Sequence, residues 1–114
     1  MKILANNDME RTFDGVKVPL GINTFEDEVF EAALTNSQRL AGMITRGRIV
    51  EADSYAELED RLESEELIEL LDQSLPSSFK PKWRKRKLEE FKEKFSDETV
   101  LDWLDERIDN VEVA

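Results

Sequence analysis

The side chains of this chain that could take part in a reaction are its carboxylates, its lysines and one tyrosine, because it contains no histidine and no cysteine. A nucleophile needs a base within hydrogen-bond reach, so the usual Ser–His and Cys–His arrangements are excluded. Carboxylates are abundant, but neighbours such as Glu65 and Glu66 occupy ordinary solvent-exposed positions of expected helices. We therefore predict no catalytic residue and no enzymatic activity.

Motifs that bind cofactors and metal ions do not fit the sequence either. The glycines at positions 15, 21, 42 and 47 match neither a dinucleotide fingerprint nor a phosphate loop. No ladder of Asp and Asn residues around a central glycine indicates a calcium loop. The lack of cysteine removes disulfides and thiolate metal sites. The prediction is a protein without a cofactor, a metal ion or a small-molecule substrate.

Positive charge is concentrated in residues 79–95, which read FKPKWRKRKLEEFKEKF. This segment holds eight of the sixteen basic residues against three glutamates. By contrast, residues 53–75 hold nine carboxylates and one arginine, and residues 96–114 hold seven carboxylates and one arginine. Such a pattern is typical of a cationic helix held between acidic ones, either inside one subunit or between copies.

Three interpretations of the cationic segment remain open. Its positive face could pair with the flanking acidic helices while Phe79 and Trp83 lie in the core. It could contact phosphates while an aromatic ring stacks on a base. It could also dock on an acidic protein. Trp103, which is offset from the apolar stripe of the last expected helix, is a further candidate for an interface. The predicted partner-binding residues are Trp83, Arg84, Lys85, Arg86, Lys87 and Trp103.

The N-terminal part, residues 1–52, predicts a small module of the ββααβ type. The apolar run at residues 2–6 predicts a strand. Residues 11–13 and 16–18 predict the two arms of a hairpin around Asp14-Gly15, because a type I′ turn needs positive φ at both central positions.

The second half of this module predicts two short helices and a closing strand. Pro19 ends the hairpin arm by withholding an N–H group, and Gly21 permits a turn after it. Thr24 and Ser37 are expected to cap the two helices. The apolar pair at residues 49–50 predicts the strand.

Residues 53–114 predict a separate helical module of about four short helices. Ser54 and Glu57 form a capping box for the first helix. The apolar face loses its phase near Ser64, which predicts a break between two helices. The aliphatic residues after the break are expected in the core: Leu67, Ile68, Leu70 and Leu71.

A loop over about residues 73–81 separates these helices from the last two, because Pro and Ser residues cluster there. The cationic helix is expected to begin after Pro81, which is acceptable in a first turn, and Trp83 could anchor that turn. Ser96 is expected to cap the final helix. The expected fold class is therefore α+β, with no apolar run long enough to cross a membrane.

The N-terminal module contains two runs, RTFDGVKVPLG and EDEVFEAALTNSQRLAGMITRGRIVEAD, that carry a resemblance to a known family. They resemble the N-terminal module of small Mu-like prophage (FluMu-type) proteins and related tailed-phage virion-region proteins. In that pattern a hairpin carries a VPxG turn, here residues 18–21. A helix then leads to an I-x-R-G-x-I/L element, here residues 44–49, and to a closing strand. The resemblance covers about residues 3–53 and implies a phage or prophage protein of the head or neck region.

These observations favour a non-enzymatic structural or assembly accessory protein of tailed phages, such as a minor head-associated or head–tail region protein. It would dock on phage structural proteins or on a second copy of itself, in the virion or the host cytoplasm, without a membrane partner. Two alternatives remain. One is an acidic phage inhibitor of a host nucleic-acid-binding protein. The other is a nucleic-acid-binding adaptor that uses the basic helix, although the flanking negative charge would compete with nucleic acid.

Overall fold

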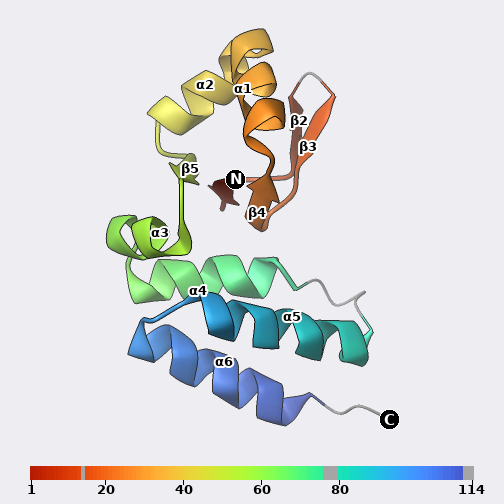
Figure 1. Ribbon diagram of the computed structural model, residues 1–114, viewed down its shortest axis with the longest axis vertical. Helices are drawn as coiled ribbons and strands as arrows, with labels where there is room; N and C mark the ends of the chain where they lie inside the picture. The colour runs from red at the N-terminus through yellow and green to blue at the C-terminus, as the bar shows by residue number, and fades with distance from the viewer. Residues whose placement is uncertain (14, 76–79, 112–114) are drawn as a thin grey trace.

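The computed structural model describes residues 1–13, 15–75 and 80–111, and shows an α+β fold with strands first and helices after them (Figure 1). The three-stranded antiparallel sheet has the order β4-β1-β5, and the other two strands form a separate hairpin. The strands are β1 (Lys2–Asn6), β2 (Arg11–Phe13), β3 (Val16–Val18), β4 (Gly21–Phe25) and β5 (Ile49–Ala52). The fold class predicted from the sequence is confirmed.

Helices α1 and α2 precede β5, and the remaining four follow it. Their bounds are α1 (Asp27–Asn36), α2 (Gln38–Thr45), α3 (Tyr55–Arg61), α4 (Ser64–Gln73), α5 (Pro81–Lys94) and α6 (Glu98–Asn110). Helix α5 begins with Pro81 in its first turn, as predicted. Asp14 and Phe79, which the sequence places in the hairpin turn and in the core, lie outside the described residues, as does part of the predicted loop at 73–81.

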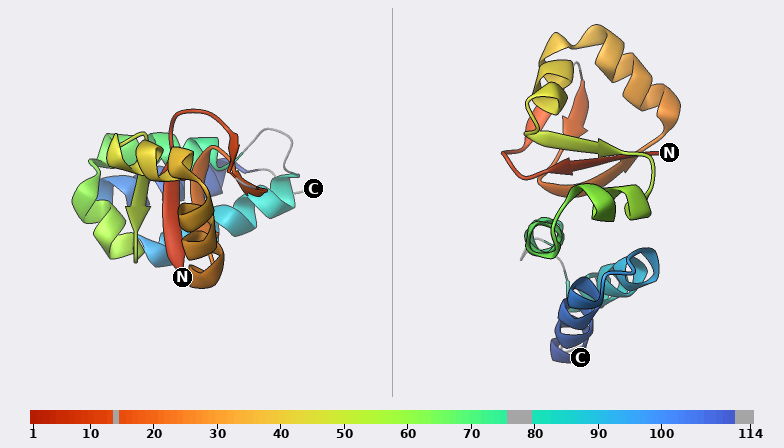
Figure 2. Two further views of the ribbon diagram at one scale, coloured as in Figure 1. Left: turned by 90° about the horizontal axis from the view of Figure 1, so that it is seen from above. Right: turned by 90° about the vertical axis from the view of Figure 1, so that its left-hand side faces the viewer.

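Both faces of the sheet are covered by helices, as the right-hand view of Figure 2 shows. The central strand β1 alternates between the two sides, because successive side chains of a strand point to opposite faces. Leu4 packs in a cluster with residues of α1, α2, β5 and the hairpin. Ile3 and Ala5 pack in a second cluster with residues of α3, α4, α5 and α6.

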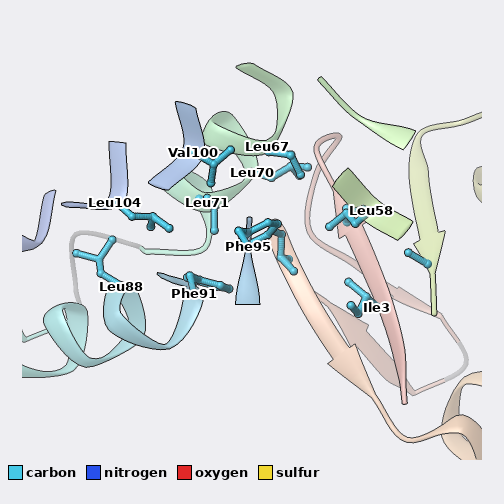
Figure 3. Packing of buried hydrophobic residues seen from close by; sticks show 13 residues of the cluster. Ile3, Leu58, Leu67, Leu70, Leu71, Leu88, Phe91, Phe95, Val100 and Leu104 are labelled. Carbon is cyan, nitrogen blue, oxygen red and sulfur yellow. The ribbon is translucent and has the colours of Figure 1, made fainter. Parts of the chain in front are cut away.

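The second cluster joins the two parts of the chain that the sequence divides at residue 52 (Figure 3). Its buried members from the first part are Ile3, Ala5, Ile22 and Ala52, and those from the second part are Leu58, Leu67, Leu70, Leu71, Leu88, Phe91, Phe95, Val100 and Leu104. At about 25 cal/mol for each Å² of apolar surface removed from water, burial of these aliphatic and aromatic side chains is the main force that holds the helices on the sheet.

The helix breaks follow from the local sequence. Ser37 and Ser54 cap α2 and α3, because each hydroxyl accepts a backbone N–H from the first turn, as predicted. The chain is extended at Leu62 and Glu63, between α3 and α4, where the apolar phase slips. The predicted break near Ser64 is therefore confirmed.

Two sequence predictions about caps are wrong. Thr24 lies in strand β4, opposite Ile3 of β1, so the expected turn at Gly21 is the start of a strand that the sequence did not predict. Helix α6 is capped by Asp97, whose Oδ1 accepts the Val100 N–H at 3.1 Å. Ser96 lies one residue before this cap, and its N–H and hydroxyl both donate to Glu59.

A close contact between β4 and α4 fixes the sheet against the helices. The backbone N–H of Ile22 donates to Oγ of Ser74 at 2.8 Å, and the same hydroxyl donates to the Leu70 carbonyl. Gly21 has a φ of +99°, and a Cβ placed on it would lie 2.2 Å from Oγ of Ser74. The two segments can therefore meet only because residue 21 has no side chain.

Candidate docking surface on helix α5

Helix α5 is held in place by its C-terminal half. Leu88 and Phe91 are buried in the helix, and Phe95 is buried just after it. Tyr55 of α3 meets Phe95 edge to face, with 5.2 Å between the ring centroids. Burial raises the pKa of the Tyr55 hydroxyl, so this group stays protonated and serves packing. The N-terminal half of α5 is left to extend along the surface.

The first turns of α5 carry positive charge, which is unfavourable at the N-terminus of a helix. The N-cap residue Lys80 makes no side-chain capping hydrogen bond, and the first turn contains no acidic residue. Positive charges at the N-terminus oppose the helix dipole, at a cost of about 0.3–1 kcal/mol for each well-placed charge. The positive charges of the sequence KWRKRK therefore do not stabilise the N-terminal end of this helix.

The neighbouring helices compensate in part, because α4 and α6 end beside the start of α5 (Figure 1). The C-terminal carbonyl groups of a helix favour nearby cations. The three helix ends enclose an open cavity of about 820 Å³. Its lining includes Gln73, Leu75, Arg84, Leu88, Trp103 and Arg107.

The six residues predicted to bind a partner fall into three places. Arg84 and Trp103 line the cavity just described. Trp83, Lys85 and Arg86 line a shallower hollow on the outer side of α5. Lys87 lies apart from both groups, beside the sheet and Phe91. The structure therefore does not bring the six residues into one site.

Trp83 is exposed, which contradicts the expectation that it anchors the first turn of the helix in the core. Its exposed fraction is 55%. The guanidinium carbon of Arg86 lies 5.7 Å from the centroid of the ring, which is the geometry of a cation–π contact. We call the outer surface formed by Lys82, Trp83, Lys85 and Arg86 the cationic face; Glu89 lines the same hollow.

The hypothesis that the flanking acidic helices neutralise α5 is supported near the C-terminus of the helix. Lys92, near its C-terminus, pairs with Asp105 of α6 at 2.5 Å, and this contact raises the pKa of Lys92. In the described part of the chain, Lys82, Lys85 and Arg86 have no ion pair within 4.0 Å. The cationic face therefore presents its charge to solvent.

Several carboxylates of the acidic segments are already used inside the protein. Glu57 accepts the Asp53 N–H, Glu59 accepts two bonds from Ser96, and Glu66 accepts the Glu63 N–H. Asp97 accepts the Ser64 hydroxyl at 2.7 Å, and this bond, with the N–H of Val100, lowers the pKa of Asp97.

Antiparallel packing explains why these groups do not meet the cationic face. Helices α4 and α6 begin where α5 ends, so their acidic first turns lie at the opposite end of the helical layer (Figure 1). Carboxylates near helix N-termini are stabilised by the helix dipole. The same rule places the acidic residues far from the cations.

Two residues near these surfaces were not among those predicted. Lys82 belongs to the cationic face, and its place one residue before Trp83 in the basic run was a usable signal. Arg107 covers Trp103, with 5.0 Å from the guanidinium carbon to the ring centroid. The spacing of four residues on one helix is the pattern by which this contact could be predicted.

In the described residues, no group of three or more acidic side chains is arranged to hold a metal ion. No helix in the same ranges is both long and apolar enough to span a bilayer. Comparison of the chain with protein-family models, with curated proteins and with solved structures found no match. The function must therefore be inferred from the residues and their geometry.

Proposed function

We propose that the protein is a non-enzymatic structural or assembly accessory of tailed phages, at the head or the head–tail region, and that it acts by docking through the cationic face. The observation that carries this proposal is an exposed tryptophan surrounded by cations that have no ion pair in the described residues. The phage setting is supported by the resemblance of residues 3–53 described above. The partner surface is acidic protein.

The two components of the face have different roles in docking. A tryptophan side chain supplies a large area of apolar contact at low entropic cost. Truncation of such a residue at an interface often lowers the binding free energy by about 2–4 kcal/mol. Lysine and arginine at the edge of an interface chiefly raise the association rate and set orientation. Trp83 therefore provides affinity, while Lys82, Lys85 and Arg86 select an acidic partner.

The experiment is quantitative mass spectrometry of phage particles purified after induction of a strain that carries the gene. The unaltered chain is expected in the particles at a constant ratio to the capsid protein. Trp83→Ala and the triple replacement of Lys82, Lys85 and Arg86 by Gln are each expected to lower that ratio at least about tenfold, as loss of an interface anchor would. Replacement of the exposed Arg46 by Gln is the control and should not change it.

Two results would refute the proposal. One is a chain that is missing from the particles while particle yield is normal without the gene. The other is a ratio that none of the replacements on the cationic face alters.

A nucleic-acid-binding adaptor is the second candidate, because the exposed Trp83 with Arg86 over its ring is also suited to stacking on an unpaired base. The test is a gel-shift series with a labelled single-stranded oligonucleotide at several salt concentrations. Binding that weakens steeply with salt, and is lost when Arg84, Lys85, Arg86 and Lys87 are replaced by Gln, would favour this candidate. Binding that the replacement leaves unchanged would dispose of it.

A further inference from the structure

We propose that the acidic surface bound by the cationic face is helix α1 of a second copy of this chain. This inference rests on the docking role proposed above and names its occupant. The relevant surface of α1 consists of Glu26, Glu28, Val29, Glu31 and Ala32, all of which are exposed. We call it the acidic face.

The acidic face differs from the other carboxylate-rich parts of the protein because its charges are uncommitted. Asp27 pairs with the N-terminal amine at 2.8 Å. Within the described residues, the side chains of Glu26, Glu28 and Glu31 have no ion pair and accept no hydrogen bond. The carboxylates of Glu57, by contrast, serve both a backbone N–H and Arg61.

An apolar side chain lies among these charges. Val29 is 43% exposed, although its neighbour Phe30 is buried against the sheet. The helix dipole accounts for acidic residues in the first turn of α1. It does not account for Glu31, one turn further on, or for the exposure of Val29.

The two faces match in charge and in arrangement. Each is the exposed side of about two helical turns and carries one exposed apolar residue; the α1 face is acidic, and the α5 face carries three cations and Glu89. When the helices are laid against each other, the ring of Trp83 covers Val29. Lys82 and Arg86 then reach Glu28 and Glu31, because residues three or four apart lie on one side of a helix.

The two faces lie at opposite ends of the molecule, so one copy cannot satisfy its own charges. Figure 1 shows α1 at one end of the long axis and α5 toward the other, and the molecule extends 44 Å along that axis. A contact between unlike surfaces leaves one free face of each kind. Such an interface extends into an open chain, or closes into a ring if the rotation permits.

The net charge of −11 does not prevent this contact at physiological salt. The Debye length is about 8 Å at 0.15 M ionic strength, so repulsion between bodies of this size is largely screened. Groups about 4 Å apart across the contact still attract each other. A pair of helix faces buries less surface than a standard interface, so the association is weak and becomes significant at high local concentration, as on a particle.

The experiment is sedimentation analysis of the purified full chain over concentrations up to about 1 mM, which covers weak contacts. The mass is expected to rise with concentration at moderate salt and to fall back to the monomer at about 1 M salt. Variant A, Lys82→Glu with Arg86→Glu, and variant B, Glu28→Lys with Glu31→Lys, are each expected to lower the association constant roughly tenfold.

A mixture of variants A and B provides the decisive measurement. The reversed α5 face of variant A fits the reversed α1 face of variant B, and the unreversed faces fit each other. The mixture is therefore expected to associate more strongly than either variant alone, which also shows that both are folded. Arg46→Glu with Lys94→Glu is the control, since it makes the same charge change as variant A elsewhere and should leave association intact.

Several outcomes would overturn the inference: a chain that stays monomeric at every concentration, association that both variants retain, or a mixture that does not recover it. Particle incorporation separates this inference from the docking role. If the cationic face binds a different acidic partner, variant A loses incorporation while variant B keeps it. If the docking role itself is wrong, variant A is incorporated normally.

Discussion

Replacement of Gly21 by alanine tests whether the sheet and the helical layer depend on one close backbone contact. Residue 21 has a φ of +99°, and an added Cβ would lie 2.2 Å from Oγ of Ser74 and 2.8 Å from both the Cα and the N atom of Ser74. The hydroxyl could rotate away, but the backbone of Ser74 ends helix α4 and cannot do so without moving the helix.

The magnitude follows from three costs. An alanine in the left-handed region costs about 1–2 kcal/mol through backbone strain alone. Displacing Ser74 adds about 1–3 kcal/mol for overpacking and about 1–2 kcal/mol if the bond from the Ile22 N–H is lost. We therefore expect Gly21→Ala to lower the free energy of unfolding by about 3–7 kcal/mol, a large part of the stability of a small domain.

Gly15 and Gly47 supply matched controls. They have φ values of +84° and +76°, and a Cβ at either position would have nothing within 4 Å. Alanine at these positions should therefore cost only the backbone strain, about 1–2 kcal/mol. The difference between Gly21→Ala and the controls measures the contact with Ser74.

The assay is urea unfolding monitored by circular dichroism. All variants are compared with one common value for the dependence of the unfolding free energy on urea concentration. A second variant, Gly21→Ala with Ser74→Ala, removes the nearest atom and should recover less than half of the loss, because the Ser74 backbone still obstructs the Cβ. A cost for Gly21→Ala within about 1 kcal/mol of the controls would show that the contact relaxes freely. Full recovery in the double variant would show that the hydroxyl alone causes the obstruction.

Two further predictions concern surface and capping residues. Trp83→Ala should change the unfolding free energy by less than about 1 kcal/mol, because the ring is largely exposed. Phe91→Ala should lower it by about 3–5 kcal/mol, because that ring is buried. Equal losses for the two variants in urea unfolding would contradict this placement of Trp83. The pKa of Asp97 is lowered from its ordinary value of 3.8, so its contribution to stability is present above that pH and is lost as the pH falls through the folded value. Asp97→Asn should therefore reduce the loss of stability between about pH 5 and pH 3, and an unchanged pH dependence of unfolding would exclude this role.

The local features of the fold could be predicted because they depend on neighbouring residues. The strand at residues 2–6 follows from a short apolar run, and the hairpin arms, the caps at Ser37 and Ser54, and the start of α5 at Pro81 follow from turn and cap chemistry. Strand β4 could not be predicted this way. Its five residues include Thr24, which the sequence alone suggests as a helix cap, and they become a strand only through pairing with β1.

The candidate surface was predicted in its composition but not in its geometry. The sequence predicts that basic and aromatic residues in the first half of α5 bind a partner. It gives no information on which side of that helix is covered, so it groups Trp83 with Arg84 and Trp103. Packing of α5 against α6 separates them, because residues adjacent along a helix point in different directions.

The sequence by itself determined the charge on each helix, the positions of most helix ends and the lack of histidine and cysteine. Only the tertiary structure decided where those charges lie. Antiparallel packing places the acidic first turns of α4 and α6 at the far end from the cationic start of α5, so among the described residues Lys82, Lys85 and Arg86 form no ion pair with them. The reason is that helix composition is fixed by local rules, whereas ion pairing depends on the distance between segments that only the shared hydrophobic core brings together.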